Sequence, residues 1–215
     1  MRNRVLNITN GEYFNEYFLS RFGGVALPFC ENMMDGTSVE EIYSKSFIRV
    51  RAQSLGVSEA EYESKACVFR ALREREFAKL CLWFGKDTFC QANLLTLLAY
   101  LEQIGYRGEV ELNYIDDEDF SIIESGIVLR LGGYGASYRE IFLQRRKPSE
   151  FWGLVESAFD LYFDYHDRNG ALAELVRANT GKDKQGLVRV LIENSKAYGL
   201  SVEQAERLIE VYGNR

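Results

Sequence analysis

Histidine is almost absent from this sequence, and cysteine is sparse. The 215 residues include one histidine, His166, and four cysteines with no C-x-x-C spacing. Zinc sites are built mostly from cysteine and histidine, so the usual ligand set is missing and we predict no metal-binding residues of that kind. A single histidine also excludes Ser-His or Cys-His catalysis in the N-terminal half, unless His166 folds back onto it. Free thiols in a reducing compartment are the simplest interpretation of the cysteines.

Long apolar runs and an excess of positive charge are also absent. No stretch of about 20 apolar residues occurs, and the N-terminus lacks the apolar run of a signal peptide. We therefore expect a cytoplasmic protein that does not enter a membrane. Twenty-six Lys and Arg against 32 Asp and Glu give a net charge of −6. Because this charge repels phosphate backbones, we expect no broad nucleic-acid binding.

The sequence does contain an ordinary globular composition and alternating strand and helix patterns. Hydrophobic residues make up 47% and charged residues 27%, which suits one large domain or one domain with a small appendage. The alternation predicts an α/β fold, with a mostly parallel sheet of four to five strands flanked by helices. The predicted strands are 4–9, 24–29, 79–84, 110–115 and an edge strand 126–131; the predicted helices are 12–22, 39–55, 58–75 and 89–104.

The pattern changes after Pro148, where the periodicity predicts helices only. We therefore predict an α/β domain over residues 1–147 and a helical C-terminal segment over residues 148–215. This segment would serve as a packing surface or as the surface of a homo-oligomer. Its length of about 65 residues is near the lower limit for independent folding.

The loops that follow the strands are the predicted location of a functional site. In open parallel sheets, ligands bind at the carboxyl ends of the strands, where helix N-termini present free N–H groups. These loops read "TNGE", "CENMMDG", "GKDTFCQAN" and "DDED". The candidate ligand-binding residues are Asn10, Gly11 and Glu12 for one wall, Glu31, Asp35 and Gly36 for a second, and Gly85, Asp87, Thr88 and Gln91 for a third.

Helix capping is an alternative explanation for several of these residues. The patterns Thr9-x-x-Glu12, Thr37-x-x-Glu40 and Thr88-x-x-Gln91 each fit a capping box, in which two side chains satisfy free backbone N–H groups. With Thr88 as the cap, Asp87 would lie just outside the helix. There it would either favour the helix dipole or face a ligand.

Other polar features have ordinary structural interpretations. Cys90 would lie in the first turn of a helix, where a thiol can be activated, but cysteine is more often buried. Asn93 suits a packing role. The glycine cluster "LGGYGAS" (131–137) fits a turn better than a phosphate cradle, because it lacks the Lys-Ser/Thr pair of a P-loop. Arg49 and Arg51 cannot share one helix face, and a solvated face suits them better than an anionic ligand.

The block "WFGKDTFCQANLL" resembles a bacterial domain of unknown function, DUF1835. The sequence departs from the family pattern at Asn7, where histidine is common, at Glu12, where aspartate is common, and at Thr37, where proline is common after Gly36. The resemblance spans about residues 4–145; it implies an α/β fold and a site at the Asp87 turn, and it implies no particular reaction. The matching positions are Trp83, Phe84, Gly85, Asp87, Phe89, Cys90, Gln91, Asn93, Leu94 and Leu95.

These observations predict a small-molecule site, for a nucleotide or another phosphorylated metabolite, at the carboxyl ends of strands one to three. Backbone N–H groups at Gly11 and Thr88 would hold an anion. In an enzyme, Asp87 or Glu12 would be the general base, or part of an oxygen-ligand set for Mg²⁺. The alternative is a non-catalytic binding or regulatory module that acts through its helical C-terminus.

Overall fold

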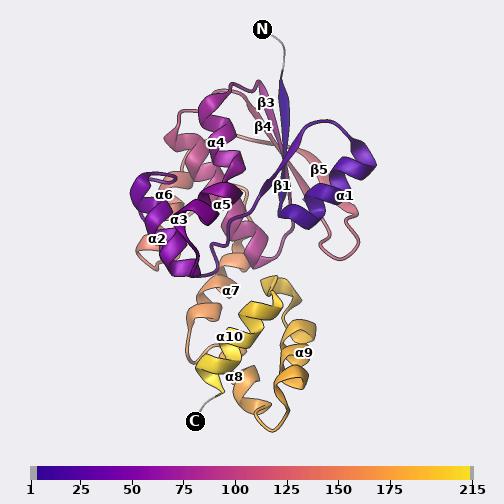
Figure 1. Ribbon diagram of the computed structural model, residues 1–215, viewed down its shortest axis with the longest axis vertical. Coiled ribbons are helices and arrows are strands. Elements are labelled where there is room, and N and C mark those ends of the chain that lie inside the picture. The colour runs from indigo at the N-terminus through magenta and orange to yellow at the C-terminus, as the bar shows by residue number, and fades with distance from the viewer. Residues whose placement is uncertain (1–3, 214–215) are drawn as a thin grey trace.

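The computed structural model describes residues 4–213 and consists of a five-stranded sheet flanked by helices (Figure 1). The strands are β1 (Val5–Asn10), β2 (Ala26–Phe29), β3 (Lys79–Phe84), β4 (Glu109–Ile115) and β5 (Ile122–Leu129). Their order is β2-β1-β3-β4-β5. The first four strands are parallel, whereas β5 pairs with β4 in the antiparallel sense. The predicted α/β fold with a mostly parallel sheet is confirmed.

Alternating side chains fix the register of the central strands. Leu80, Leu82 and Phe84 of β3 are completely buried, and β1 places Leu6 beside Leu80 and Ile8 beside Leu82. Burial of each such side chain contributes roughly 1.5–3 kcal/mol, before the entropic cost of folding is counted. A slip of one residue would turn every one of these side chains to the opposite face. The alignment of the strand ends, and hence of the loops that follow them, is therefore well determined.

Helices cover the two faces of the sheet unequally (Figure 1). One face carries α1 (Glu12–Phe22), which packs against the sheet through Phe14 and Phe18. The other face carries α5 (Thr88–Gln103), which is buried throughout from Cys90 to Leu101. Around α5 lie α2 (Lys45–Leu55), α3 (Glu59–Lys65), α4 (Cys67–Glu74) and α6 (Tyr134–Tyr138). The chain continues from α6 into a π-helical turn, η1 (Arg139–Leu143).

No helix within residues 4–213 is long and apolar enough to cross a membrane.

Three elements differ by more than two residues from their predicted bounds. The helix predicted over 39–55 begins only at Lys45, with Ser44 as its N-cap, so no helix follows the predicted Thr37 cap. The helix predicted over 58–75 is divided into α3 and α4 at Ala66, whose φ of −81° and ψ of 37° end the first helix. The predicted edge strand begins four residues earlier, at Ile122.

The late start of α2 has a cause in Arg51. Its guanidinium donates hydrogen bonds to the backbone carbonyls of Asn32, Asp35 and Thr37, at 2.6, 2.8 and 3.0 Å. The loop after β2 therefore wraps around this side chain instead of extending the helix. The prediction of a solvated face is wrong for Arg51, which is 1% exposed, and holds for Arg49, whose side chain is 70% exposed.

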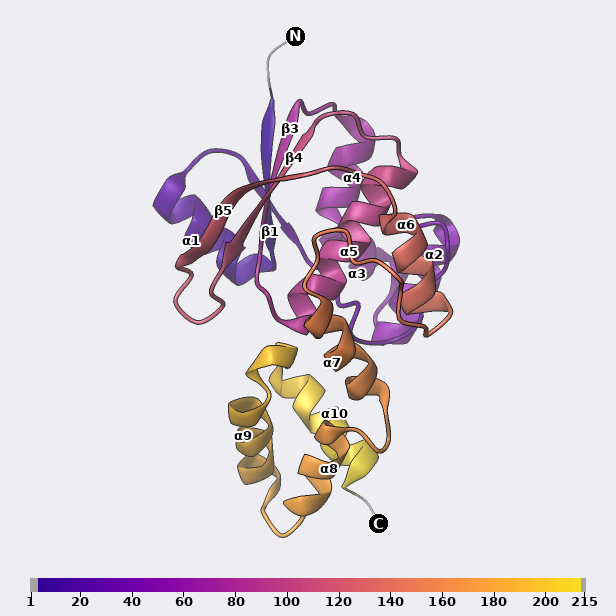
Figure 2. The same cartoon turned by 180° about the vertical axis from the view of Figure 1, so that it is seen from behind.

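The described chain after Pro148 is helical, as predicted. Its elements lie beyond the carboxyl ends of β1, β3 and β4 (Figure 2). The hydroxyl of Thr88 donates to the carbonyl of Ala197 at 3.1 Å, and Lys196 forms an ion pair with Glu118. The helical segment thus covers the sheet edge where the site is predicted. The elements are α7 (Glu156–His166), α8 (Ala171–Ala178), α9 (Lys184–Asn194), the 3₁₀ turn η2 (Lys196–Tyr198) and α10 (Val202–Tyr212).

Candidate functional site

The crevice between β1 and β3 is the topological switch point of the sheet. From β1 the chain passes into α1 on one face, and from β3 it passes into α5 on the other face. Loops that leave neighbouring strands in opposite directions open a crevice at the strand ends, which is where open α/β sheets bind ligands. The predicted candidate residues lie at this edge, at the end of β1, in the loops after the strands, or in the first turns of α1 and α5.

Asn10, the last residue of β1, contacts the first turns of α5. Its Nδ2 donates to Sγ of Cys90 at 2.8 Å, and its Oδ1 accepts from Nδ2 of Asn93 at 3.1 Å. Asn93 also donates to the carbonyl of Glu31 at 2.6 Å and accepts from the N–H of Met33 at 3.1 Å. Asn93 therefore has the packing role expected for it, and it fastens the loops after β1 and β2 to α5.

Asp87 is the N-cap of α5. Its Oδ1 accepts a hydrogen bond from the backbone N–H of Cys90 at 3.0 Å. Its Oδ2 is buried, and no donor among residues 4–213 contacts it. Asp87, and not Thr88, is therefore the cap of α5, while its second oxygen is held inside the protein without a hydrogen-bond donor. That Asp87 faces a ligand stays a prediction.

The predicted capping box at Thr88 and Gln91 is wrong, because both side chains bind other parts of the fold. Thr88 donates to Ala197 in the C-terminal segment. Nε2 of Gln91 donates to the carbonyl of Gly85 at 2.7 Å, and its Oε1 accepts from the N–H of Val155 at 3.0 Å. Both side chains are buried. Gln91 joins the turn after β3 to the residue before α7, and Thr88 joins the start of α5 to η2.

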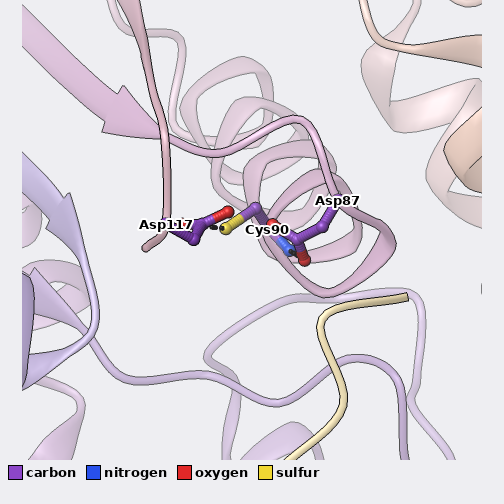
Figure 3. Close-up of side chains that lie close together, drawn as sticks. All are labelled: Asp87, Cys90 and Asp117. Carbon is purple, nitrogen blue, oxygen red and sulfur yellow. Dashed lines mark hydrogen bonds between the residues drawn. The ribbon is translucent and has the colours of Figure 1, made fainter. Parts of the chain in front are cut away.

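A third acid, Asp117, completes a cluster with Asp87 and Cys90 (Figure 3). One potential ligand atom from each of the three residues lies within 4.8 Å of the other two. Sγ of Cys90 lies 3.6 Å from Oδ1 of Asp117. Asp117 follows β4 and was not among the residues predicted for the site. The only sequence signal for it was the acidic loop "DDED", which does not indicate which of its acids approaches Cys90.

Burial and like charges keep protons in this cluster. Asp117 is exposed as a residue, but the partial desolvation of its carboxyl raises its pKa to about 8, and the hydrogen bond to and charge of Asp87 add to the effect. Burial, followed by the charges of Asp87 and Asp117, raises the pKa of the Cys90 thiol well above its ordinary value. At neutral pH Asp117 is therefore largely protonated and the thiol is uncharged. Cys90 is not an activated nucleophile in this state, in agreement with its buried position.

Two glycines make room for the carboxylates of the cluster. A Cβ on Gly85 would collide with the carboxyl of Asp117, and a Cβ on Gly199 would collide with that of Asp87. Gly199 also has a φ of 66°, which disfavours other residues. In the predicted third wall, Gly85 thus lets the carboxyl of Asp117 come close to the backbone. Gly199 of the C-terminal segment lies over the carboxyl of Asp87.

The predicted second wall is built around a buried ion pair. Both Glu31 and Arg51 are buried, with Nη2 of Arg51 2.9 Å from Oε1 of Glu31, and Tyr62 donates to the other oxygen of Glu31. Gly36, with a φ of 78°, packs so closely on Ser54 that a Cβ would collide with it. Both carboxylate oxygens of Glu31 therefore have partners within the protein. Gly36 allows the loop after β2 to approach Ser54 closely.

Asp35 joins this wall to the C-terminal helices. Its Oδ1 accepts from the hydroxyl of Tyr165 at 2.7 Å. Its Oδ2 accepts from Asn32 and Gln204, both at 2.8 Å, and from Arg207 at 2.6 Å. These four donors occupy both oxygens, so Asp35 connects the loop after β2 to α7 and α10.

The predicted first wall lines a pocket of about 310 Å³ between the sheet edge and α10. Gly11 is the N-cap of α1, and no side chain caps that helix. The predicted capping box is wrong here too, because Thr9 donates instead to Oδ1 of Asn15 at 2.9 Å. The N–H of Gly11 donates to Phe29 at 3.1 Å, so it is not free to hold an anion as predicted. Residues lining the pocket include Gly11, Glu12, Glu31, Lys65, Ser201 and Gln204.

The glycine cluster at 131–137 holds a carboxylate of the protein itself. Oε1 and Oε2 of Glu102 accept hydrogen bonds from the backbone N–H groups of Tyr134 and Gly135, at 3.0 and 2.8 Å. The start of α6 is therefore occupied by the side chain of a residue in α5. This agrees with the interpretation of the cluster as a turn and not as a phosphate cradle.

Comparisons with known proteins give no further guide to this site. No family model matches the chain, no curated protein matches it, and no solved structure matches it. The function is therefore inferred from two neighbouring features at the sheet edge: the pocket lined by Glu12 and Lys65, and the cluster of Asp87, Cys90 and Asp117. They adjoin one another through consecutive residues, because Gly11 and Phe89 line the pocket while Asn10 and Cys90 contact each other.

Proposed function

We propose that the protein binds a nucleotide or another phosphorylated metabolite in the pocket at the carboxyl ends of β1 and β2. The observation that carries this proposal is the position of the pocket, beside the switch point and at the uncapped start of α1. Its volume of about 310 Å³ suits a small ligand.

The chemistry of the lining suits a phosphate group next to a polar body. The first turn of α1 has N–H groups without a side-chain cap, and the helix dipole makes this end attractive to an anion. Lys65 supplies a positive charge on the same pocket. Glu12 supplies a carboxylate suited to accept hydrogen bonds from sugar hydroxyls. If the ligand is turned over, Glu12 is the better candidate for a general base, because Gly199 covers Asp87.

A regulatory module is the second candidate, and one observation favours it. Gln204 of α10 lines the pocket and also donates to Asp35, which Arg207 and Tyr165 contact as well. A ligand in the pocket would thus touch the sheet edge and the C-terminal helices together. Its binding energy would then favour one arrangement of the helices over others.

A thermal-shift screen of the full chain tests both candidates. The compounds are nucleotides and sugar phosphates, each with and without Mg²⁺. A ligand present at 100 times its Kd stabilises the folded state by about 2.7 kcal/mol, which raises the Tm of a chain of this size by about 5–10 °C. Lys65→Ala should reduce the shift, while Lys182→Ala, an exposed lysine in the C-terminal segment, should leave it unchanged.

Two outcomes decide against the proposal: no compound shifts the parent, or the shift is equal in Lys65→Ala and the parent. Product analysis of the ligand after prolonged incubation then separates an enzyme from a regulatory module. Conversion that Glu12→Gln abolishes indicates catalysis. An unchanged ligand together with altered protease sensitivity of residues 148–215 indicates regulation.

The relation to DUF1835 and a cytoplasmic location complete the proposal. The block from Trp83 to Leu95 that resembles the family builds β3, its turn and the buried part of α5, so the resemblance falls on the part of the chain that forms the acid and thiol cluster. All four cysteines are free thiols, which suits a reducing compartment.

A further inference from the structure

We propose that Asp87, Cys90 and Asp117 form a binding site for a divalent cation of borderline softness, with Zn²⁺ as its best representative. The site adjoins the proposed ligand pocket but does not depend on it. Its three ligands come from the turn after β3, the first turn of α5 and the loop after β4. One cation would therefore fasten three elements that meet at the sheet edge.

The spacing of the three side chains suits a single ion. Two ligand atoms bound to a tetrahedral Zn²⁺ at about 2.0–2.3 Å lie about 3.5 Å apart. Sγ of Cys90 and Oδ1 of Asp117 are already 3.6 Å apart, and one potential ligand atom from each residue falls within 4.8 Å of the others. Figure 3 shows Asp117 approaching the thiol from one side and Asp87 from the other. Small side-chain rotations would close the set.

A buried oxygen without a donor is the second observation that points to a cation. Oδ2 of Asp87 is buried and receives no hydrogen bond from residues 4–213. A buried carboxylate oxygen left in this way is costly, by about 1–3 kcal/mol or more. A bound cation would satisfy both carboxylates and the thiolate together.

The surrounding residues hold the ligands in place. The N–H of Cys90 binds Oδ1 of Asp87 at 3.0 Å, and Nδ2 of Asn10 donates to Sγ of Cys90 at 2.8 Å. Gly85 and Gly199 leave space for the two carboxyls. Hydrogen bonds to metal ligands orient them, and a donor on the sulfur stabilises its thiolate form.

The thiol of Cys90 distinguishes zinc from magnesium as the expected ion. Zn²⁺ binds cysteine sulfur together with carboxylate oxygens. Mg²⁺ prefers a near-octahedral set of oxygen ligands and keeps several waters, so a set that contains one sulfur suits it poorly.

Metal titration of the full chain in the absence of any nucleotide or sugar phosphate tests the inference. The protein is treated with chelator, kept reduced and titrated with Zn²⁺ against a chromophoric competitor. We expect one equivalent to bind. Co²⁺ in place of Zn²⁺ should give a thiolate-to-cobalt charge-transfer band in the near ultraviolet.

Variants assign the ligands. Cys90→Ala and Asp117→Asn should each weaken Zn²⁺ binding by about 100-fold or more, since even supporting residues around metal sites are worth 10–100-fold. Cys90→Ala should also abolish the cobalt band. The matched controls are Cys81→Ala, another buried cysteine, and Asp119→Asn, an exposed acid of the same loop; both should bind like the parent.

The inference is overturned if the parent takes up no Zn²⁺, if its cobalt complex lacks the thiolate band, or if the controls lose binding as much as the cluster variants. The first two outcomes are measured on the parent, so they decide the matter even if a variant fails to fold. Because no phosphorylated compound is present, the result is separate from that of the ligand screen.

Discussion

Gly199 lies directly against the carboxylate of Asp87, so that a Cβ at position 199 would collide with Oδ1. The two residues are 112 positions apart in the sequence. Their contact brings the turn before α10 onto the acid that caps α5. The C-terminal helices therefore share the candidate site with the sheet, and several measurements can show how strongly.

Substitution of Gly199 tests this contact. Gly199→Ala introduces both a left-handed backbone strain, at a φ of 66°, and a collision with Asp87. Gly56→Ala is the matched control, because Gly56 has a φ of 70° and nothing lies within 4 Å of its added Cβ. We expect the control to lower the free energy of unfolding by about 1–2 kcal/mol, and Gly199→Ala to lower it further in urea titrations. Equal losses would show that the contact is loose.

The buried ion pair of Arg51 and Glu31 should dominate the stability of the loop after β2. Arg51→Ala leaves the buried carboxylate of Glu31 without its partner, and we expect a loss of about 3–5 kcal/mol in the free energy of unfolding. Arg49→Ala removes a solvated arginine two residues away and should cost less than about 1 kcal/mol. The double variant Arg51→Met with Glu31→Gln should recover part of the loss. Similar effects of Arg51→Ala and Arg49→Ala would refute this account.

Stability should fall with rising pH because of Asp117. Its folded-state pKa of about 8 lies above 3.8, the ordinary value of an aspartate, so between these values the folded state binds more protons than the unfolded state. The contribution is fully present below about pH 4 and is lost as the pH rises through 8. Asp117→Asn removes the titration. Urea unfolding at pH 5 and pH 8 should therefore show a smaller decline for the variant than for the parent, and parallel profiles would contradict the assignment.

The hydrogen bonds and the ion pair of Asp35 should contribute unequally to the free energy of unfolding. Arg207 is 47% exposed, so Arg207→Ala should lower the free energy of unfolding by less than about 1 kcal/mol. Asp35→Ala leaves the donors of Tyr165 and Gln204 without an acceptor in a buried site, which should cost about 2–4 kcal/mol. Limited proteolysis should then cut residues 148–215 faster in Asp35→Ala than in the parent. If Arg207→Ala is the more damaging change, the exposed ion pair matters more than the buried bonds.

Strands and helices whose burial pattern is visible in the sequence itself were predicted accurately. The strand at 79–84 and the helix at 12–22 have the predicted bounds, because alternating burial and helical spacing are visible in the sequence itself. Capping was predicted poorly, since a threonine three residues before an acid or amide fits a cap whether or not a helix begins there. Thr9, Thr37 and Thr88 all follow this pattern, and none of them caps a helix.

The candidate site was predictable only in part. The turn after β3 stood out because its residues are polar and specific. Asp117 could not be selected among the acids of "DDED". Its carboxyl can approach Cys90 only because Gly85, which has no side chain, leaves space for it. Arg51 could not be identified as a buried residue, because the carbonyls that it binds belong to a loop up to 19 residues earlier. In both cases the position of the side chain depends on contacts with segments far away in the sequence.

The path of the chain gives the site an order of assembly. Ribosomes make residues 5–129, which contain all five strands, before residues 195–207 that cover Asp87 and bind Asp35. Since domains fold as units and the N-terminal one folds first during synthesis, the sheet can form while its carboxyl edge still faces solvent. During that interval of a few seconds, at about 5–20 residues per second, a metal ion or metabolite in the cell would reach the crevice freely. A newly made chain could therefore acquire its ligand before the cover closes.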